Sequence, residues 1–289
     1  MPIAAILWLA AAAAQPADRE TIDVIGRKPE EVRKEAQEFV RRVGVADQPV
    51  ARWVEPVCPD VQGLSAELGA RVEARVRAVA EQAGIKLAKP GCKGNLMIAF
   101  AKQGEAVVKQ VATRSPDMLK DVTPAHRAYL YDGKTPIRWW HVTQMRTKDG
   151  MRDMGNDVPP FVALCGPGGA QLGGNVHTRY RSSIASTQMV RVLRAATVIV
   201  DVDDAHGKPL DSVTDFAALV GLAEIRPSDP PPPASVLSLF ATGGPQDLTP
   251  LDRTFLRTLY KLPLDRTAVA HRGLLVRGIT GGDKLRSDQ

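Results

Sequence analysis

The feature that most constrains the fold is an alternation of segments with helical apolar spacing and short apolar runs of strand length. Helical spacing predicts helices over 29–43, 65–83, 104–114, 212–222, 249–260 and 265–279. Apolar runs predict strands over 50–57, 95–101, 138–146, 182–192 and 196–202. Because helices and strands are interleaved before the chain becomes helical at its C-terminal end, we predict the α+β class, with a mixed sheet, packed helices and a C-terminal helical subdomain.

Residues with known positional preferences mark several of the expected boundaries. Pro29 opens the first helix, where its missing N–H costs nothing, and Gly44 ends it. Ser65 is the expected N-cap of the second helix, Thr249 precedes Pro250 at the start of another, and Asp265 is the expected cap of the last. The run at 95–101 is apolar without alternation, which is typical of a strand inside a sheet.

The chain divides into six predicted segments. Residues 3–14 form an apolar run that ends in three alanines, which predicts a signal peptide at 1–14 and export to the periplasm or beyond the cell. This run is shorter than the roughly 20 residues of a membrane span, and no later run approaches that length, so no transmembrane segment is expected after signal removal. The other segments are a flexible start at 15–28, an α+β domain at 29–226, a proline-rich spacer at 227–234, a helical unit at 235–280 and a disordered tail at 281–289.

Composition argues against nucleic acid as a partner. The net charge of +6 arises from 38 basic and 32 acidic side chains, and the basic residues are interleaved with acidic ones along the chain. Nucleic-acid-binding surfaces instead gather basic residues, often with exposed aromatic side chains between them. A solvated surface of mixed charge is the better interpretation.

The three cysteines are Cys58, Cys92 and Cys165. In an oxidising compartment two of them are expected to be bonded. Cys58 and Cys92 flank a predicted helix and its return strand, so this pair is favoured, and such a bridge would stabilise the fold by roughly 3–4 kcal/mol. Three single pairings remain open from the sequence, as does the state of Cys165.

The segment from Thr214 to Leu222 has the spacing of the zinc-peptidase helix H-E-x-x-H-x-L-G-L. Thr214 and Ala218 occupy the positions of the two zinc ligands, and Asp215 occupies that of the general base. Alanine cannot bind zinc and threonine is a poor ligand, so no metal, cofactor or catalytic residue is assigned here. The simpler alternative is an ordinary amphipathic helix whose apolar residues pack inward.

Other candidate sites are weaker still. The histidines at 126, 141, 177, 206 and 271 include no pair four residues apart, and His141 is expected to pack in the core beside two tryptophans. The acidic segment 201–207 lacks the ligand spacing of an EF-hand and is expected to form a solvated hairpin tip. The glycine-rich segment 166–174 lacks the Gly-Lys-Ser/Thr of a phosphate-binding loop and predicts a mobile surface loop.

Three patches resemble an uncharacterised family of exported bacterial proteins, a domain-of-unknown-function family with a zincin-like fold. They are Cys58 to Leu64 together with Cys92 to Phe100, then Phe216 to Ile225, and finally Ser238 to Phe240 with Leu248 to Tyr260. The resemblance implies a metallopeptidase-related fold in which the zinc motif is degenerate.

The function predicted from these observations is that of a non-catalytic, zincin-like binding protein, or pseudoenzyme, of the periplasm. Its partner would be an envelope protein or a peptide held in the cleft above the motif helix. One alternative is a zinc-dependent hydrolase in which Asp215, Glu224 and a distant histidine converge. The other is a structural or assembly protein of the envelope, held by its first helix or its C-terminal helices.

Overall fold

A long strand, β5 (Met189–Asp201), organises the sheet. The computed structural model describes residues 28–132, 134–147 and 186–281. On one side β5 pairs with the antiparallel strand β4 (Ile137–Thr147). On the other it pairs in parallel with β1 (Arg52–Trp53) and with β3 (Leu96–Ala101), and β3 in turn pairs with β2 (Pro59–Gln62). The sheet is therefore mixed, as predicted, and β3 lies inside it.

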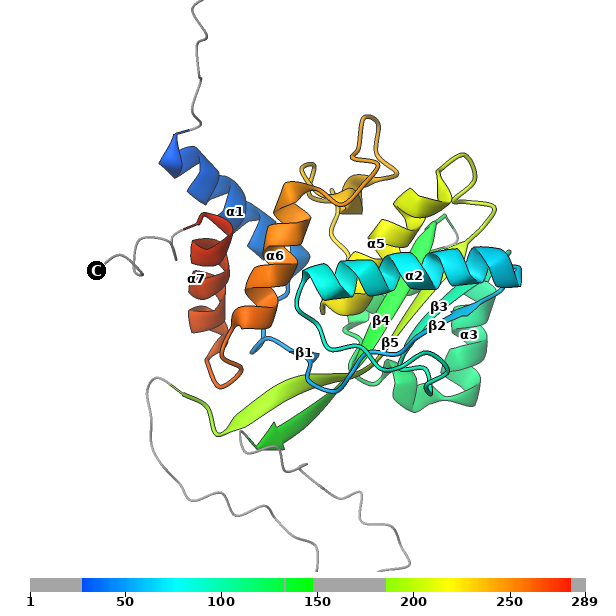
Figure 1. Ribbon diagram of the computed structural model, residues 1–289, viewed down its shortest axis with the longest axis horizontal. Helices are drawn as coiled ribbons and strands as arrows, with labels where there is room; N and C mark the ends of the chain where they lie inside the picture. Colours follow the sequence, from blue (N-terminus) through cyan, green and yellow to red (C-terminus); the bar gives the residue numbers. More distant parts are fainter. Residues whose placement is uncertain (1–27, 133, 148–185, 282–289) are drawn as a thin grey trace, which may run out of the picture.

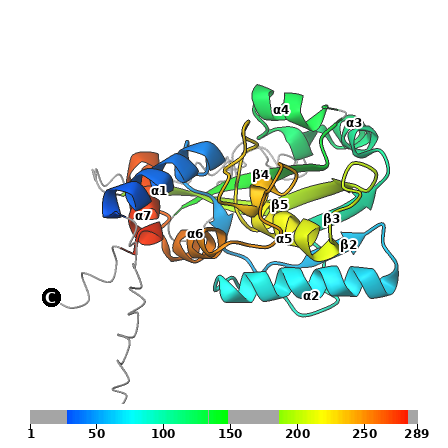
Figure 2. The same cartoon turned by 90° about the horizontal axis from the view of Figure 1, so that it is seen from above.

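Helices cover both faces of this sheet (Figures 1 and 2). One face carries α3 (Gly104–Arg114), a 3-10 turn η1 (Pro116–Leu119) and α4 (Pro124–Leu130), which enclose a small core around Trp140. The other carries α5 (Leu210–Leu222), with α2 (Ala66–Gln82) packed over it. The helices α1 (Pro29–Val43), α6 (Pro250–Lys261) and α7 (Ala268–Ile279) gather at one end of the molecule.

The segments before and after the proline-rich stretch share one core. Phe39 of α1, Leu219 of α5, Phe255 of α6 and Leu275 of α7 belong to a single cluster of buried side chains. The chain bends at Asp229 and Pro230, which are joined by a cis peptide bond, and it turns again before the short η3 (Val236–Ser238).

Several expected elements need correction. The two strands predicted at 182–192 and 196–202 are one strand from Met189 onward, because no glycine or proline interrupts the run between them. The strand predicted at 50–57 is reduced to Arg52–Trp53 and an isolated bridge between Val57 and Leu87, since Pro56 cannot donate to a ladder. The last helix is capped by Thr267, whose hydroxyl accepts from the Ala270 N–H, and not by Asp265. Helix α4 was not expected at all.

The acidic segment at 201–207 is not a hairpin tip. Asp201 ends β5, and its turn leads into α5. The carboxylate is buried, accepts a hydrogen bond from the Gly104 N–H at 2.7 Å and lies 3.7 Å from an Arg138 nitrogen. Burial of an aspartate requires such partners, so Asp201 fixes the start of α3 against the end of β5.

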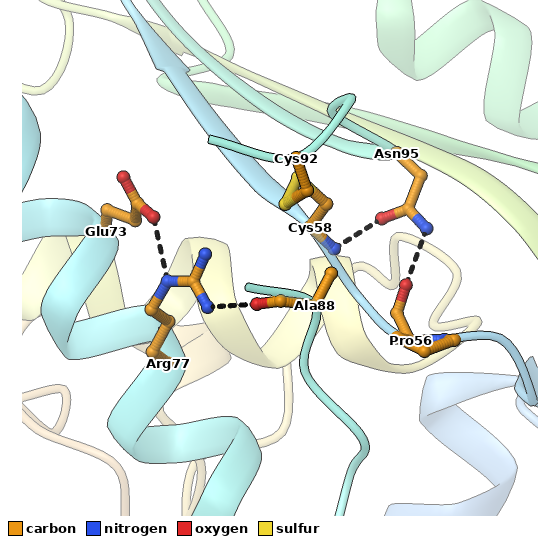
Figure 3. Close-up of a disulfide and its surroundings, with 7 residues drawn as sticks. All are labelled: Pro56, Cys58, Glu73, Arg77, Ala88, Cys92 and Asn95. Atoms are coloured by element: carbon orange, nitrogen blue, oxygen red, sulfur yellow. Dashed lines mark hydrogen bonds and ion pairs between the residues drawn. A yellow bond between two sulfur atoms is a disulfide. The ribbon is translucent and has the colours of Figure 1, made fainter. Parts of the chain in front are cut away.

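Cys58 and Cys92 form a disulfide, as favoured from the sequence (Figure 3). Cys58 immediately precedes β2, and Cys92 lies shortly before β3, with the two Cα atoms 6.1 Å apart. Asn95 reinforces the junction, since its side chain accepts from the Cys58 N–H and donates to the Pro56 carbonyl. The bridge thus joins the entrances of two neighbouring parallel strands.

Some predictions fall outside the described residues. They are the signal peptide at 1–14, nearly all of the segment at 15–28, Cys165, the loop at 166–174, His177 and the tail beyond Gly281.

Candidate binding cleft at the end of helix α5

Helix α5, which carries the degenerate motif, is buried on all sides. Every residue from Ser212 to Leu222 is buried, as its nearly continuous apolar sequence requires. The Thr214 hydroxyl donates to the Leu210 carbonyl at 2.7 Å, and Ala218 has no exposed surface. The two positions that correspond to zinc ligands therefore lie in the core and line neither of the two large cavities described below.

Asp215, at the position of the catalytic base, holds two other elements to α5. Its side chain is 1% exposed and accepts two hydrogen bonds from Arg75 of α2, each at 2.7 Å. It also accepts from the Leu248 N–H at 3.0 Å. Both carboxylate oxygens are thus engaged in a bidentate ion pair of the kind that fixes geometry, which leaves Asp215 unsuited to proton transfer.

The C-terminal end of α5 has an unusual set of caps. The last carbonyls of a helix have no partner within it, and here side chains from other elements supply the donors. His141 donates to Val220, Trp53 to Gly221 and Tyr260 to Leu222, at 2.7, 3.1 and 2.6 Å. Just beyond the helix, Trp139 donates to the Ile225 carbonyl at 2.8 Å. Strands β1 and β4 and helix α6 thereby converge on one helix end.

The buried histidines are neutral hydrogen-bond donors. The Nε2 atoms of His126 and His141 donate to the carbonyls of Trp139 and Val220. Burial lowers the pKa of each to about 4, because the charged form loses its hydration. His271 accepts from the Val50 N–H and donates to the Pro263 carbonyl, so both its nitrogens are used, whereas His206 is exposed. Within 28–132, 134–147 and 186–281, no three His, Cys, Asp or Glu side chains gather where they could hold a metal ion.

Two adjoining cavities open beside this end of α5. We call the first, of about 550 Å³, the aromatic cavity, and the second, of about 500 Å³, the polar cavity. Thr123, His126 and Arg226 line both, so the two form one composite cleft. It lies between helix α4 and the segment that follows α5, and each cavity is within the size range of small-ligand sites.

The aromatic cavity is walled by rings in mutual contact. Tyr129, Trp139, Phe216 and Phe240 form a chain of edge-to-face pairs with ring centroids 5.3 to 6.2 Å apart, and His126 lies against Tyr129 and Trp139. Phe216 is the contribution of α5, and Phe240 follows η3. Such a wall favours a bulky apolar group.

In the polar cavity, Glu224 and Asp121 are already hydrogen-bonded to other residues of the protein. Arg191 makes two hydrogen bonds to Glu224, at 2.7 and 2.9 Å. Burial raises the pKa of Glu224 in spite of this cation. Asp121 accepts from the N–H and the hydroxyl of Thr143. The rearranged hydrolase would need Asp215, Glu224 and a distant histidine to converge. Asp215 instead lies inside α5 and lines neither cavity, whereas Glu224 lies beyond the helix end and lines the polar cavity.

Sequence reasoning did not single out most of this cleft. His141 was expected in the core and is buried there. Tyr129 and Arg226 were not singled out, and Phe240 was named only within a patch of family resemblance, because these residues come from separate segments without a shared motif. One signal was present: Thr123-Pro124 has the same N-cap and N1 pattern as Thr249-Pro250, and it marks the start of α4.

Comparisons with protein-family models, with curated proteins and with solved structures each give no match. Among the described helices, none combines the length and the apolar character needed to cross a membrane.

Proposed function

We propose that the protein is an exported, non-catalytic binding protein that holds an apolar group of a peptide or envelope protein in the composite cleft. The observation that carries this proposal is the aromatic cavity, a concave site of about 550 Å³ walled by four aromatic rings. A zincin-like origin of the fold, with a degenerate zinc motif, is part of the same proposal. It is motivated by the spacing of Thr214, Asp215 and Ala218.

A binding role is favoured over catalysis by how the acidic groups are used. Asp215 is bonded to Arg75, Glu224 to Arg191 and Asp121 to Thr143. A general base must reach the proton that it removes, and each of these carboxylates is engaged in holding the fold. The disulfide between Cys58 and Cys92 supports an exported protein, because such bonds persist in oxidising compartments.

The envelope-assembly alternative draws less support. It calls for a broad exposed apolar patch on the first or the C-terminal helices. In the described ranges the large apolar side chains that are exposed are Val54, Leu68, Met97, Met145 and Val269. Only Val269 belongs to a C-terminal helix, so these side chains form no such patch.

The test is calorimetric titration of the full chain with N-acetylated tripeptides that end in Phe, Leu or Ser. We expect the Phe and Leu peptides to bind, the Ser peptide not to bind, and all three to be recovered uncut. Ala125, exposed and lining the aromatic cavity, offers a blocking variant, Ala125→Trp. Ala128→Trp is the matched control, because Ala128 is exposed on the same helix and lines neither cavity.

Two results would overturn the proposal. One is equal binding by the Ala125→Trp variant and the Ala128→Trp control, which would place the ligand elsewhere. The other is cleavage of the peptides together with about one zinc per chain by elemental analysis, which would favour the hydrolase.

A further inference from the structure

Arg226, the cation shared by both cavities, keeps donors available. Arg191 has both terminal nitrogens on Glu224 and one also on the Pro49 carbonyl. The Arg226 side chain instead makes a single hydrogen bond, from Nη1 to Asp47 Oδ2 at 2.8 Å, and it is 28% exposed. Among the described residues the other two nitrogens of its guanidinium group have no acceptor, although the side chain lines both cavities. A guanidinium in this state suits a carboxylate.

His126 adds an acceptor at the same place. Its Nε2 donates to the Trp139 carbonyl at 2.7 Å, which makes Nδ1 the unprotonated nitrogen. No hydrogen bond reaches Nδ1 from the residues that the structure describes, and the side chain lines both cavities beside Arg226. Burial, and to a lesser extent the nearby positive charge of Arg226, lowers the pKa of His126 to about 4. At neutral pH the ring therefore accepts a hydrogen bond.

The charged residues that line the two cavities determine how a ligand with a carboxylate group is oriented in the cleft. Asp132 and Asp229, both exposed, line the aromatic cavity but not the polar cavity. The polar cavity alone is lined by Lys120 and Arg191 and by the acids Asp121 and Glu224, and Arg191 pairs with Glu224, so acids do not outnumber cations on this side. A ligand carboxylate is thus repelled from the aromatic side and drawn towards Arg226 at the junction.

We infer that the cleft recognises the C-terminal residue of a peptide whose last side chain is aromatic or large and aliphatic. The side chain enters the aromatic cavity, the terminal carboxylate pairs with Arg226, and the N–H of the last residue donates to His126 Nδ1. This inference rests on the proposed binding function and adds the chemical class of the ligand. A free carboxylic acid with an apolar body shares the first two contacts but lacks the N–H.

The test compares three probes on the full chain by calorimetry: acetyl-Ala-Ala-Phe with a free carboxylate, the same peptide as its C-terminal amide, and 3-phenylpropanoate. We expect the free acid to bind about tenfold to a hundredfold more tightly than the amide, the range for a charge-assisted bond. It should also bind about threefold to tenfold more tightly than 3-phenylpropanoate, which lacks the N–H.

Variants assign the carboxylate contact. Arg226→Gln should bring the ratio of acid to amide affinity close to one, while Asp47→Asn, which removes only the existing partner of Arg226, should keep it. Equal affinity for acid and amide in the unaltered protein overturns the inference but leaves the proposed function standing. Equal affinity for 3-phenylpropanoate and the peptide acid overturns the peptide assignment. If none of the three probes binds, both the inference and the proposed function fail.

Discussion

The two ends of helix α5 are held in opposite ways. Near its N-terminal end, Asp211 and Asp215 pair with Arg71 and Arg75, which lie four residues apart on α2. At its C-terminal end, neutral side chains from β1, β4 and α6 donate to backbone carbonyls. One end is therefore held by ion pairs between side chains. The other end is held by uncharged side chains that donate hydrogen bonds to backbone carbonyls.

This difference explains where a cleft can form. Charged pairs need either water or complete compensation. The Arg71–Asp211 pair stays in contact with water, whereas the Asp215 carboxylate is enclosed by α2 and by the loop at Leu248. Neutral caps tolerate an apolar setting, and their aromatic and imidazole rings also provide walls. Trp139 and His126, which meet at the Trp139 carbonyl, line the aromatic cavity. Of the rings that donate at or just beyond this helix end, His141 lines the polar cavity and Trp139 lines the aromatic cavity, so these two rings serve both the helix end and the site.

The largest effect is expected from Arg75→Ala. It would leave the buried Asp215 carboxylate without its cation and cost about 3–5 kcal/mol in the free energy of unfolding. Urea denaturation measures this loss. The matched control is Arg71→Ala, whose exposed pair with Asp211 should contribute little. Similar losses in the two variants would show that burial does not distinguish the two pairs.

Lowering the pH should reduce the free energy of unfolding through the buried histidines near the C-terminal end of α5. The pKa values of His126 and His141 are lowered to about 4 in the fold, against an ordinary value of 6.5. The unfolded chain therefore binds more protons, and stability falls as the pH drops from about 6.5 towards 4, by up to about 3 kcal/mol per histidine. Unfolding free energy measured across this range should show the decline. His141→Gln should flatten the decline, and substitution of the exposed His206 should not.

Tyr260→Phe tests a single cap. The change removes one hydroxyl and leaves the Leu222 carbonyl without its donor, which should cost about 1–2 kcal/mol. Thermal and urea unfolding both report it. Tyr131→Phe is the control, on a half-buried tyrosine at the end of α4. An unchanged stability of Tyr260→Phe would mean that water replaces the hydroxyl at this helix end.

The smallest effect concerns salt. Any stability difference between the unaltered protein and Arg71→Ala should vanish in about 1 M NaCl, where screening acts over about 3 Å. The loss caused by Tyr260→Phe should persist, because its bond joins uncharged groups. Melting temperatures at low and high salt compare the two ends directly. If salt also reduced the stability loss of Tyr260→Phe, the two ends of α5 would not differ in the ionic character of their contacts.

Local patterns predicted most of the elements. The caps at Ser65 and Thr249, the helix predicted at 212–222 and the interior strand predicted at 95–101 are all confirmed. The alternative of an amphipathic helix at 212–222 is wrong, because α5 is buried on all sides. The continuity of β5 was missed, because a single exposed residue, Arg194, separated two apolar runs that nothing else interrupts.

The cleft could not be predicted in the same way. The carboxylate of Asp215 looks like a degenerate catalytic base until Arg75 is placed 2.7 Å from it, and 140 positions separate the two residues. Likewise, Arg226 and His126 become one site only when α4 packs beside the segment after α5. Contacts of this kind depend on tertiary arrangement, for which a single sequence without motifs carries no signal.

The caps on α5 also restrict its length. Inserting one residue into an α-helix turns everything beyond it by about 100°. The carbonyls of Val220, Gly221 and Leu222 would then all face away from His141, Trp53 and Tyr260 at once. An insertion or deletion inside α5 should therefore be far less tolerated than a point substitution there. The caps from β1, β4 and α6 together fix the number of residues that this helix can have.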